Sequence, residues 1–265
     1  ALVQRLKLMA GLDISEKRLP QDGRFSVKVR DSTIDVRMAT LPTAYGESAV
    51  MRLLNQGGGM RGLDSIGMPA PMLARFREIL GRSTGMVLVT GPTGSGKTTT
   101  LYAALSEVNT NELKIITAED PVEYRLAGIT QVQVNEKIDL TFARVLRSIL
   151  RQDPDVVLVG EMRDPETAEI GLRAAITGHL VLSTLHTRDA MSTPFRLLDM
   201  GIPPFMVSTS LQAVISQRLV RLNCKECAIT HDPTPQQQAW LTAMGVPLNS
   251  FTPMRSIGCT ACNGT

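Results

Sequence analysis

The spacing of apolar residues separates a short N-terminal part of the chain from a longer remainder. Apolar and polar positions alternate at 25–29 and 34–38, which predicts two short strands, and 50–54 is a third short strand candidate. A helical pattern precedes them at 2–12. Residues 56–62 include three successive glycines, which lose much conformational entropy when ordered and therefore predict a flexible linker. We expect residues 1–55 to be part of a small α+β domain.

Short apolar runs alternate with helical patterns in residues 63–265. The runs predict buried strands at 86–89, 114–118, 128–134, 155–159 and 180–185. Helical patterns lie at 69–80, 101–108, 141–151 and 165–177, and the stretch from 191 to about 221 is interpreted as largely helical. Because alternating strands and helices give a parallel sheet covered on both faces, we predict an α/β fold.

A glycine-rich segment lies between the apolar run at 86–89 and the next helical pattern. It matches the phosphate-loop motif G-x-x-x-x-G-K-[ST] at every fixed position, so we predict nucleoside triphosphate binding. Lys97 is expected to reach the β- and γ-phosphates, and Thr98 to offer its hydroxyl to Mg²⁺. The predicted nucleotide-binding residues are Gly91, Pro92, Thr93, Gly94, Ser95, Gly96, Lys97, Thr98 and Thr99.

Hydrolysis requires a group that positions and activates water. Glu161 follows the apolar run 156–159 and is predicted at the carboxyl end of that strand, where ligands bind in such sheets. Gly160 stands where a generic Walker B strand has Asp, so the sequence does not separate a catalytic role of Glu161 from a role in the Mg²⁺ shell. The alternative for Glu161 is a solvated loop carboxylate.

Three more candidates follow predicted strands. Glu119 and Asp120 come at the end of the strand at 114–118, where carboxylates can orient Mg²⁺-bound water, although an exposed turn is an equal alternative. His186 ends the run 180–185 beside two hydroxyl residues, a position suited to sensing a γ-phosphate, whereas His179 precedes that strand. A lone histidine is otherwise more often structural.

Two further sets of residues have a regular spacing. The first set is basic and lies on a single helical face: Arg144, Arg147 and Arg151. These arginines either form surface ion pairs or offer guanidinium groups to phosphates across a subunit junction. The other consists of two C-x-x-C pairs, thirty-one residues apart: Cys224, Cys227, Cys259 and Cys262. Four thiolates in two such pairs predict a structural Zn²⁺ site in a segment at 222–265, with free or redox thiols as the alternative.

Composition limits the class of protein. The net charge is only +3 and aromatic residues make up 4%, which argues against a dedicated nucleic-acid binder. No apolar run is long enough to cross a membrane, so we expect a globular protein in the cytoplasm. The chain does not begin with Met, and we expect it to be a fragment of a longer polypeptide.

These motifs together resemble those of the GspE/PilB family of type II secretion and type IV pilus assembly ATPases. Residues 12–24 resemble the family's second N-terminal domain, 91–98 its Walker A motif, 116–123 its Asp box, 150–163 its atypical Walker B segment and 177–187 its His box. The cysteine pairs resemble its tetracysteine zinc element. Within the family, the phrasing at 131–147 is most similar to the ATPase of mannose-sensitive haemagglutinin pilus biogenesis.

The resemblance implies a hexameric ring of RecA-like domains that binds ATP with Mg²⁺ between the small domain and the ATPase domain. It places Arg37 and Arg52 on the phosphates, with Glu119, Asp120, Glu161 and His186 around the reacting group. The implied function is ATP hydrolysis that powers pilus or pseudopilus assembly through an inner-membrane platform protein, at the cytoplasmic face of that membrane.

Three alternatives stay open. A retraction motor of the same superfamily is the nearest, although retraction relatives usually lack the tetracysteine element. A nucleic-acid translocase or helicase would share the RecA-like core, and a nucleotide-gated scaffold would bind ATP without turnover.

Overall fold

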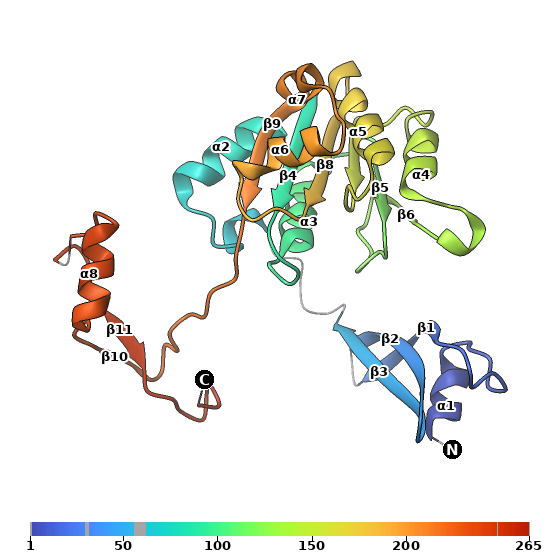
Figure 1. Cartoon of the computed structure of the whole chain (residues 1–265), viewed down its shortest axis with the longest axis horizontal. Helices are drawn as coiled ribbons and strands as arrows, with labels where there is room; N and C mark the ends of the chain where they lie inside the picture. The colour runs from blue at the N-terminus through green and yellow to red at the C-terminus, as the bar shows by residue number, and fades with distance from the viewer. Residues whose placement is uncertain (1, 30–31, 56–61, 248, 265) are drawn as a thin grey trace. The chain divides into compact units, whose positions relative to one another are not determined.

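The computed structural model describes residues 2–29, 32–55, 62–247 and 249–264, and Figure 1 shows their arrangement. The chain divides into two compact units, one ending at Arg218 and the other beginning at Leu219. Apart from Gly62, the predicted linker lies outside the described residues.

The N-terminal part of the first unit is a helix and a three-stranded antiparallel sheet, as the alternation predicted. Its elements are α1 (Leu2–Met9), β1 (Gln21–Val29), β2 (Ser32–Thr43) and β3 (Gly46–Asn55), and the strands pair in the order β1-β2-β3. Lys7 of α1 is fully buried, donates a hydrogen bond to the Glu16 carbonyl at 2.7 Å and forms an ion pair with Glu47. This pairing ties the helix to both the following loop and β3, and it satisfies a charge that would otherwise be costly to bury.

The rest of the first unit contains a six-stranded parallel sheet in the order β6-β5-β7-β8-β4-β9. Its strands are β4 (Gly85–Thr90), β5 (Ile115–Glu119), β6 (Thr130–Gln133), β7 (Val156–Val159), β8 (Leu180–Leu185) and β9 (Leu211–Ser216). The four central strands are buried along their whole length, which explains why apolar residues predominate in their sequences. The predicted α/β architecture is therefore confirmed.

Helices cover both faces of this sheet (Figure 1). One face carries α2 (Ala70–Leu80) and α3 (Lys97–Val108), with a short helix η1 (Leu63–Ser65). The other face carries four helices: α4 (Phe142–Ile149), α5 (Pro165–Thr177), α6 (Ser192–Asp199) and α7 (Pro204–Ser210). A short helix, η2 (Glu136–Ile138), precedes α4. In β4, Val87 and Val89 face the first layer, whereas Met86 and Leu88 face the second. No helix in the described part of the chain has both the length and the apolarity needed to cross a membrane.

One predicted element is wrong. The stretch from 191 to about 221 is not continuously helical, because α7 ends at Ser210 and residues 211–216 form β9, parallel to β4 at the edge of the sheet. A short apolar run fits a helix or a strand equally well by periodicity alone. The free hydrogen-bonding edge of β4 decides the outcome, and it cannot be seen in the local sequence.

The second unit is small and has little apolar core. It contains β10 (Ala228–Thr230), paired antiparallel with β11 (Met254–Ser256), and α8 (Pro235–Ala243) between them in sequence. The Thr234 side chain and Gln237 cap the start of α8 reciprocally. Among the described residues of this unit, only Cys227 is buried.

Candidate nucleotide site and metal centre

The phosphate loop connects β4 to α3, as predicted. Gly91, its first residue, has φ 144°, and a Cβ added there would lie 2.4 Å from the Gln217 carbonyl oxygen, so only glycine fits. The Lys97 ammonium donates to the Gly91 carbonyl at 3.0 Å and to the Pro92 carbonyl at 3.1 Å. Burial lowers the pKa of Lys97, with the nearby Glu161 carboxylate opposing that shift. The loop thus holds an ammonium on carbonyl oxygens, a weak set of partners that phosphate oxygens can replace.

Ser95 provides a further sign that the loop fits an anion. Its hydroxyl oxygen is buried and has no hydrogen-bond partner, although the backbone around it is ordered into a turn. Thr98, at the start of α3, is exposed and free to offer its hydroxyl to a cation. The loop residues therefore fit a nucleotide phosphate with Mg²⁺.

Glu161 and His186 follow the adjacent strands β7 and β8, and the structure brings them together. The His186 Nε2 lies 3.9 Å from a Glu161 carboxylate oxygen. The loop carrying His186 is also tied to the phosphate-loop strand, because the Thr187 N–H donates to the Thr90 hydroxyl at 3.0 Å. Three strand ends, β4, β7 and β8, therefore contribute to one site.

Gly160 explains how Glu161 is held. The Gly160 N–H donates to the Ala118 carbonyl at 2.8 Å, and its own carbonyl accepts from the Thr184 hydroxyl at 2.7 Å. A Cβ on Gly160 would stand 3.3 Å from the Ala118 oxygen, closer than an ordinary contact. The departure from a generic Walker B strand thus allows the ends of β5, β7 and β8 to approach closely.

Arg163 joins two of the predicted carboxylates, which the sequence analysis did not foresee. Its guanidinium lies 2.6 Å from Glu161 and 3.9 Å from Asp120. The hydrogen bond to Glu161 is the main cause of a raised pKa of Arg163. Its place two residues after Glu161 was visible in the sequence, but the approach to Asp120 depends on the adjacency of β5 and β7.

Glu119 is placed differently from Asp120. Its side chain is buried and accepts hydrogen bonds from the Tyr102 hydroxyl, from the Thr117 hydroxyl at 2.5 Å and from the Gln131 amide at 3.1 Å. Burial, followed by the bond to Glu119, raises the pKa of Tyr102. Asp120 is exposed. The two neighbouring carboxylates therefore face different surroundings, one inside the protein and one at the surface.

Arg37 and Arg52 lie opposite each other on β2 and β3, and Arg24 lies opposite Arg37 on β1. Three arginines in register repel one another unless an anion lies near them. Arg37 donates to the Val122 carbonyl at 2.9 Å and lies 3.2 Å from Glu123. Burial is the main cause of the lowered pKa of Arg37, and Arg24 and Arg52 contribute to it. Arg24 was not predicted, because strand register cannot be determined from one sequence.

The arginines of α4 have local partners. Arg144 lies 3.0 Å from Asp139, Arg147 pairs with Glu166, and Arg151 donates to Ser148 at 3.2 Å. These contacts match the surface ion pairs that were one of the two interpretations of this row. They leave a role at a subunit junction untested.

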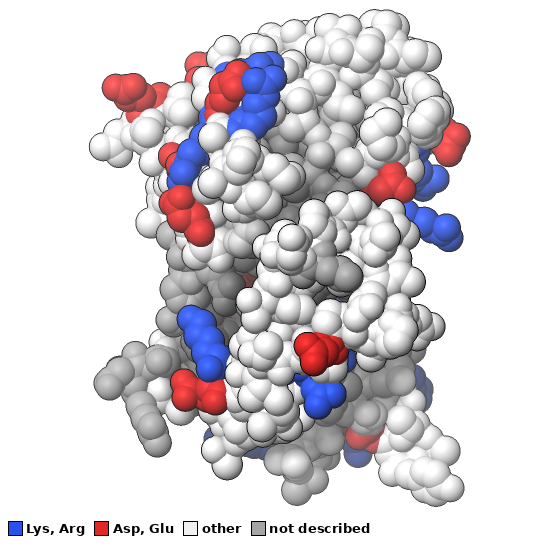
Figure 2. All heavy atoms as spheres, turned by 90° about the vertical axis from the view of Figure 1, so that its left-hand side faces the viewer, with Lys and Arg blue, Asp and Glu red and all other residues white. Residues whose placement is uncertain are grey.

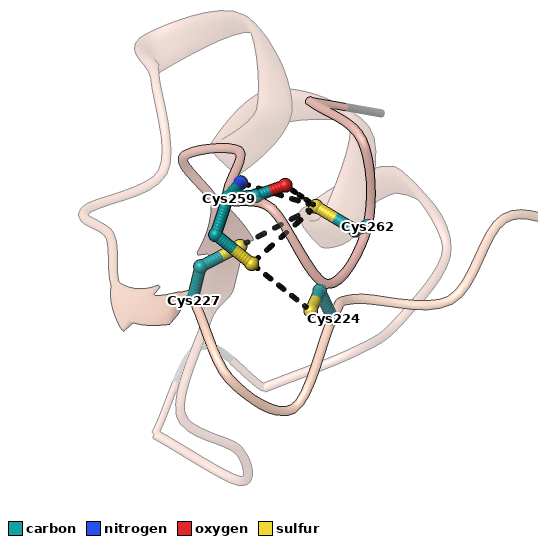
Figure 3. A group of neighbouring side chains, drawn as sticks. All are labelled: Cys224, Cys227, Cys259 and Cys262. Atoms are coloured by element: carbon teal, nitrogen blue, oxygen red, sulfur yellow. Dashed lines mark hydrogen bonds between the residues drawn. The ribbon is translucent and has the colours of Figure 1, made fainter.

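The four cysteines come together in the second unit (Figure 3). The Sγ atoms of Cys224 and Cys259 lie 3.9 Å apart, and Cys262 Sγ lies 3.8 Å from those of both Cys227 and Cys259. A tetrahedral Zn²⁺ with Zn–S bonds of about 2.3 Å requires sulfurs about 3.8 Å apart, so the donors fit this ion. The Cys259 N–H lowers the pKa of Cys262 to about 7, which favours a thiolate, whereas burial raises the pKa of Cys227 to about 11.

Comparison with known proteins gives a consistent result over the whole chain. Residues 1–265 match the family described as type II/IV secretion system protein. The chain is 51% identical over 265 residues to the type II secretion system protein HxcR of Pseudomonas aeruginosa, covering 100% of this chain and 52% of that protein. It is 52% identical over 267 residues to the type IV pilus assembly ATPase PilB of Myxococcus xanthus, covering 99% and 47%.

The fold is shared with solved structures. The pilus retraction motor PilT with bound ADP superposes with a TM-score of 0.65 at 37% identity, over 82% of this chain and 61% of that one. The ATPase DotB of Legionella pneumophila gives 0.63 at 26% identity, over 76% and 58%. The chain spans about half the length of the curated relatives it matches. With a family match over all of its residues, this chain belongs to the type II/IV secretion system protein family.

Proposed function

We propose that the protein is a Mg²⁺-dependent ATPase that powers type II secretion or pilus assembly. The observation that carries this proposal is the convergence of the phosphate loop, Glu161 and His186 at adjacent strand ends. The names of the relatives support it, since HxcR is a type II secretion protein and PilB a pilus assembly ATPase.

In this proposal each residue of the site has a separate role in ATP hydrolysis. Lys97 leaves the carbonyls of Gly91 and Pro92 and binds the phosphates, while the loop N–H groups surround them. Thr98 and Glu161 would hold Mg²⁺, which would supply charge neutralisation. Glu161 orients the attacking water and accepts its proton. His186 contacts the γ-phosphate and couples its presence to Glu161, whose carboxylate lies 3.9 Å from the His186 Nε2.

Two acidic neighbours take different roles. Asp120 is accessible and lies 3.9 Å from Arg163, so its carboxylate would be free to orient water beside a bound Mg²⁺. Glu119 was predicted to share this role, but its buried hydrogen bonds favour an anchoring role that fixes the end of β5 beneath Asp120.

We further propose a hexameric assembly in which arginines of the small sheet complete the site. Arg37 and Arg52 bind the phosphates in this proposal, because the three in-register arginines supply more positive charge than the single Glu123 carboxylate beside Arg37 offsets. The partner is an inner-membrane platform protein at the cytoplasmic face. Among related systems we favour the mannose-sensitive haemagglutinin pilus, because of the sequence at 131–147.

ATP turnover by the purified protein tests the proposal. We expect Glu161→Gln to bind ATP as the wild type does but to hydrolyse it at least about 100-fold more slowly, since a positioned base contributes about 10²–10⁴. Glu166→Gln, in an exposed carboxylate that pairs with Arg147 outside this site, serves as the matched control. Equal turnover by the two variants would remove Glu161 from the mechanism, and binding without phosphate release by the wild type would favour a nucleotide-gated scaffold.

The same assay separates the remaining alternatives. In the face shown in Figure 2, basic side chains lie beside acidic ones. The net charge of only +3 and the aromatic content of 4% disfavour a nucleic-acid motor. Stimulation of turnover by single-stranded DNA would reverse this choice. A rate per subunit that rises with protein concentration supports catalysis at a subunit junction. Whether the motor assembles or retracts a filament is tested by which of the two processes stops in cells that lack it.

A further inference from the structure

Gln217 contacts the phosphate loop from the end of β9, more than one hundred residues further along the chain. Its side-chain amide donates to the Ser95 carbonyl at 2.7 Å and accepts from the Thr100 hydroxyl at 2.9 Å. Its backbone N–H donates to the Thr90 carbonyl at 3.0 Å. One half-buried residue therefore holds the end of β4, the phosphate loop and the first turns of α3.

The bond to Ser95 has a direct consequence for the groups that would bind phosphate. In a trans peptide unit the carbonyl and the following N–H point in opposite directions. Because the Ser95 carbonyl points toward Gln217, the Gly96 N–H is directed to the other side of the loop. Gln217 thus sets the orientation of one of the N–H groups with which such loops surround phosphates.

The backbone of Gln217 fixes the loop in a second way. Its carbonyl oxygen lies against Gly91, where it leaves no room for a Cβ. The segment after β9 therefore packs directly against the first residue of the loop, which only glycine permits. The hydrogen bond from the Gln217 side chain to Ser95 and the close contact between the Gln217 carbonyl and Gly91 therefore lie at opposite ends of the same loop.

From these contacts we propose that Gln217 is a positioning residue of the ATP site: its side chain holds the phosphate loop in the conformation that binds the nucleotide. The proposal rests on the proposed ATP binding. Gln217 acts through Ser95 and Thr100 and not by touching the nucleotide. A purely structural role, in which Gln217 joins β9 to α3, would lower stability without a specific effect on nucleotide affinity.

Gln217→Met tests this proposal, because methionine keeps the length of the side chain and removes both hydrogen bonds. We expect the affinity for ADP to fall about tenfold and the KM for ATP to rise about tenfold, the equivalent of one to two lost hydrogen bonds. We expect kcat to stay within about twofold of the wild-type value. Gln212→Met is the matched control: it lies on the same strand, is also half-buried and contacts Arg82 far from the loop along β9. Binding is measured by calorimetric titration with ADP, and stability by thermal melting.

Two further variants keep the test decisive if Gln217→Met does not fold. Thr100→Val removes the hydrogen bond to Thr100 only, whereas Gln217→Leu removes both hydrogen bonds without adding a charge beside the loop. We expect Gln217→Leu to bind ADP more weakly than Thr100→Val does, because only Gln217→Leu releases the Ser95 carbonyl. Equal ADP affinity of Gln217→Met and Gln212→Met overturns the proposal, and so does equal ADP affinity of Gln217→Leu and Thr100→Val.

The wild type and Lys97→Ala distinguish failure of this inference from failure of the proposed function. If the wild type binds ADP and Lys97→Ala does not, the proposed nucleotide site is supported, and the Gln217 variants then test the positioning role alone. If the wild type does not bind ADP at all, both the ATPase proposal and the role of Gln217 are overturned.

Discussion

Single residues in this site differ in role according to what surrounds them. Glu119 and Asp120 are neighbours in sequence, yet Glu119 is 3% exposed and fully engaged by three side chains, whereas Asp120 faces solvent. Tyr102 links these surroundings to the phosphate loop, because it lies on α3 and its hydroxyl also accepts from the Glu123 N–H at 3.3 Å. The helix that begins at the phosphate loop is thereby joined to the acidic end of β5.

Tyr102→Phe is expected to destabilise the protein by about 1–3 kcal/mol, because the buried Glu119 carboxylate loses a hydrogen-bond donor. Tyr124→Phe is the control: its ring packs edge-on against Tyr102 with centroids 4.6 Å apart, and its hydroxyl makes no hydrogen bond seen within the described residues. Thermal melting of both variants is the measurement. Equal melting temperatures would show that the Tyr102 hydroxyl contributes nothing to stability.

At the level of elements, the sequence predicted the buried strands and the edge strand β6, but it missed the other edge strand, β9. Runs such as 156–159 are apolar throughout, so their place in a covered parallel sheet follows from composition. β9 was missed because its short apolar run becomes a strand only beside β4. For the same reason Gln217 and Arg24 were missed: their roles depend on strand pairing, whereas Lys97 and Glu161 follow recognisable local patterns.

Gly160→Ala tests whether the close approach of strand ends positions Glu161. A Cβ 3.3 Å from the Ala118 oxygen forces the end of β7 away from β5, and we expect a loss of about 1 kcal/mol in stability. We also expect kcat to fall about tenfold, since a small displacement of a catalytic group is enough. Gly62→Ala, where a Cβ meets nothing within 4 Å, is the control. A normal kcat in Gly160→Ala would mean that the position of Glu161 does not depend on this contact.

At the scale of the whole molecule, the two units are stabilised by different interactions. The first contains the buried sheet and its helices, and apolar burial accounts for its stability. The second has little apolar core among its described residues, so its fold depends on what holds the four cysteines together. Small domains of this kind commonly rely on a metal ion.

Removal of Zn²⁺ should therefore unfold the second unit and leave the first intact. Structural zinc contributes about 10 kcal/mol or more to such folds, far more than this unit's few buried contacts can replace. The folding of the two units can be followed by separate spectroscopic signals. The one tryptophan, Trp240, lies in α8 of the second unit, and the three tyrosines lie in the first unit: Tyr45, Tyr102 and Tyr124.

We expect one Zn²⁺ per chain and, after chelation, a fall in Trp240 fluorescence anisotropy with unchanged near-ultraviolet circular dichroism from the tyrosines. Cys259→Ser should reproduce the effect without chelator, whereas Thr230→Ala, on β10 with an exposed side chain outside the sulfur cluster, should retain the metal. Retention of the Trp240 signal after the metal has been removed would show that the second unit folds without it. Loss of both signals together would show that the two units unfold as one.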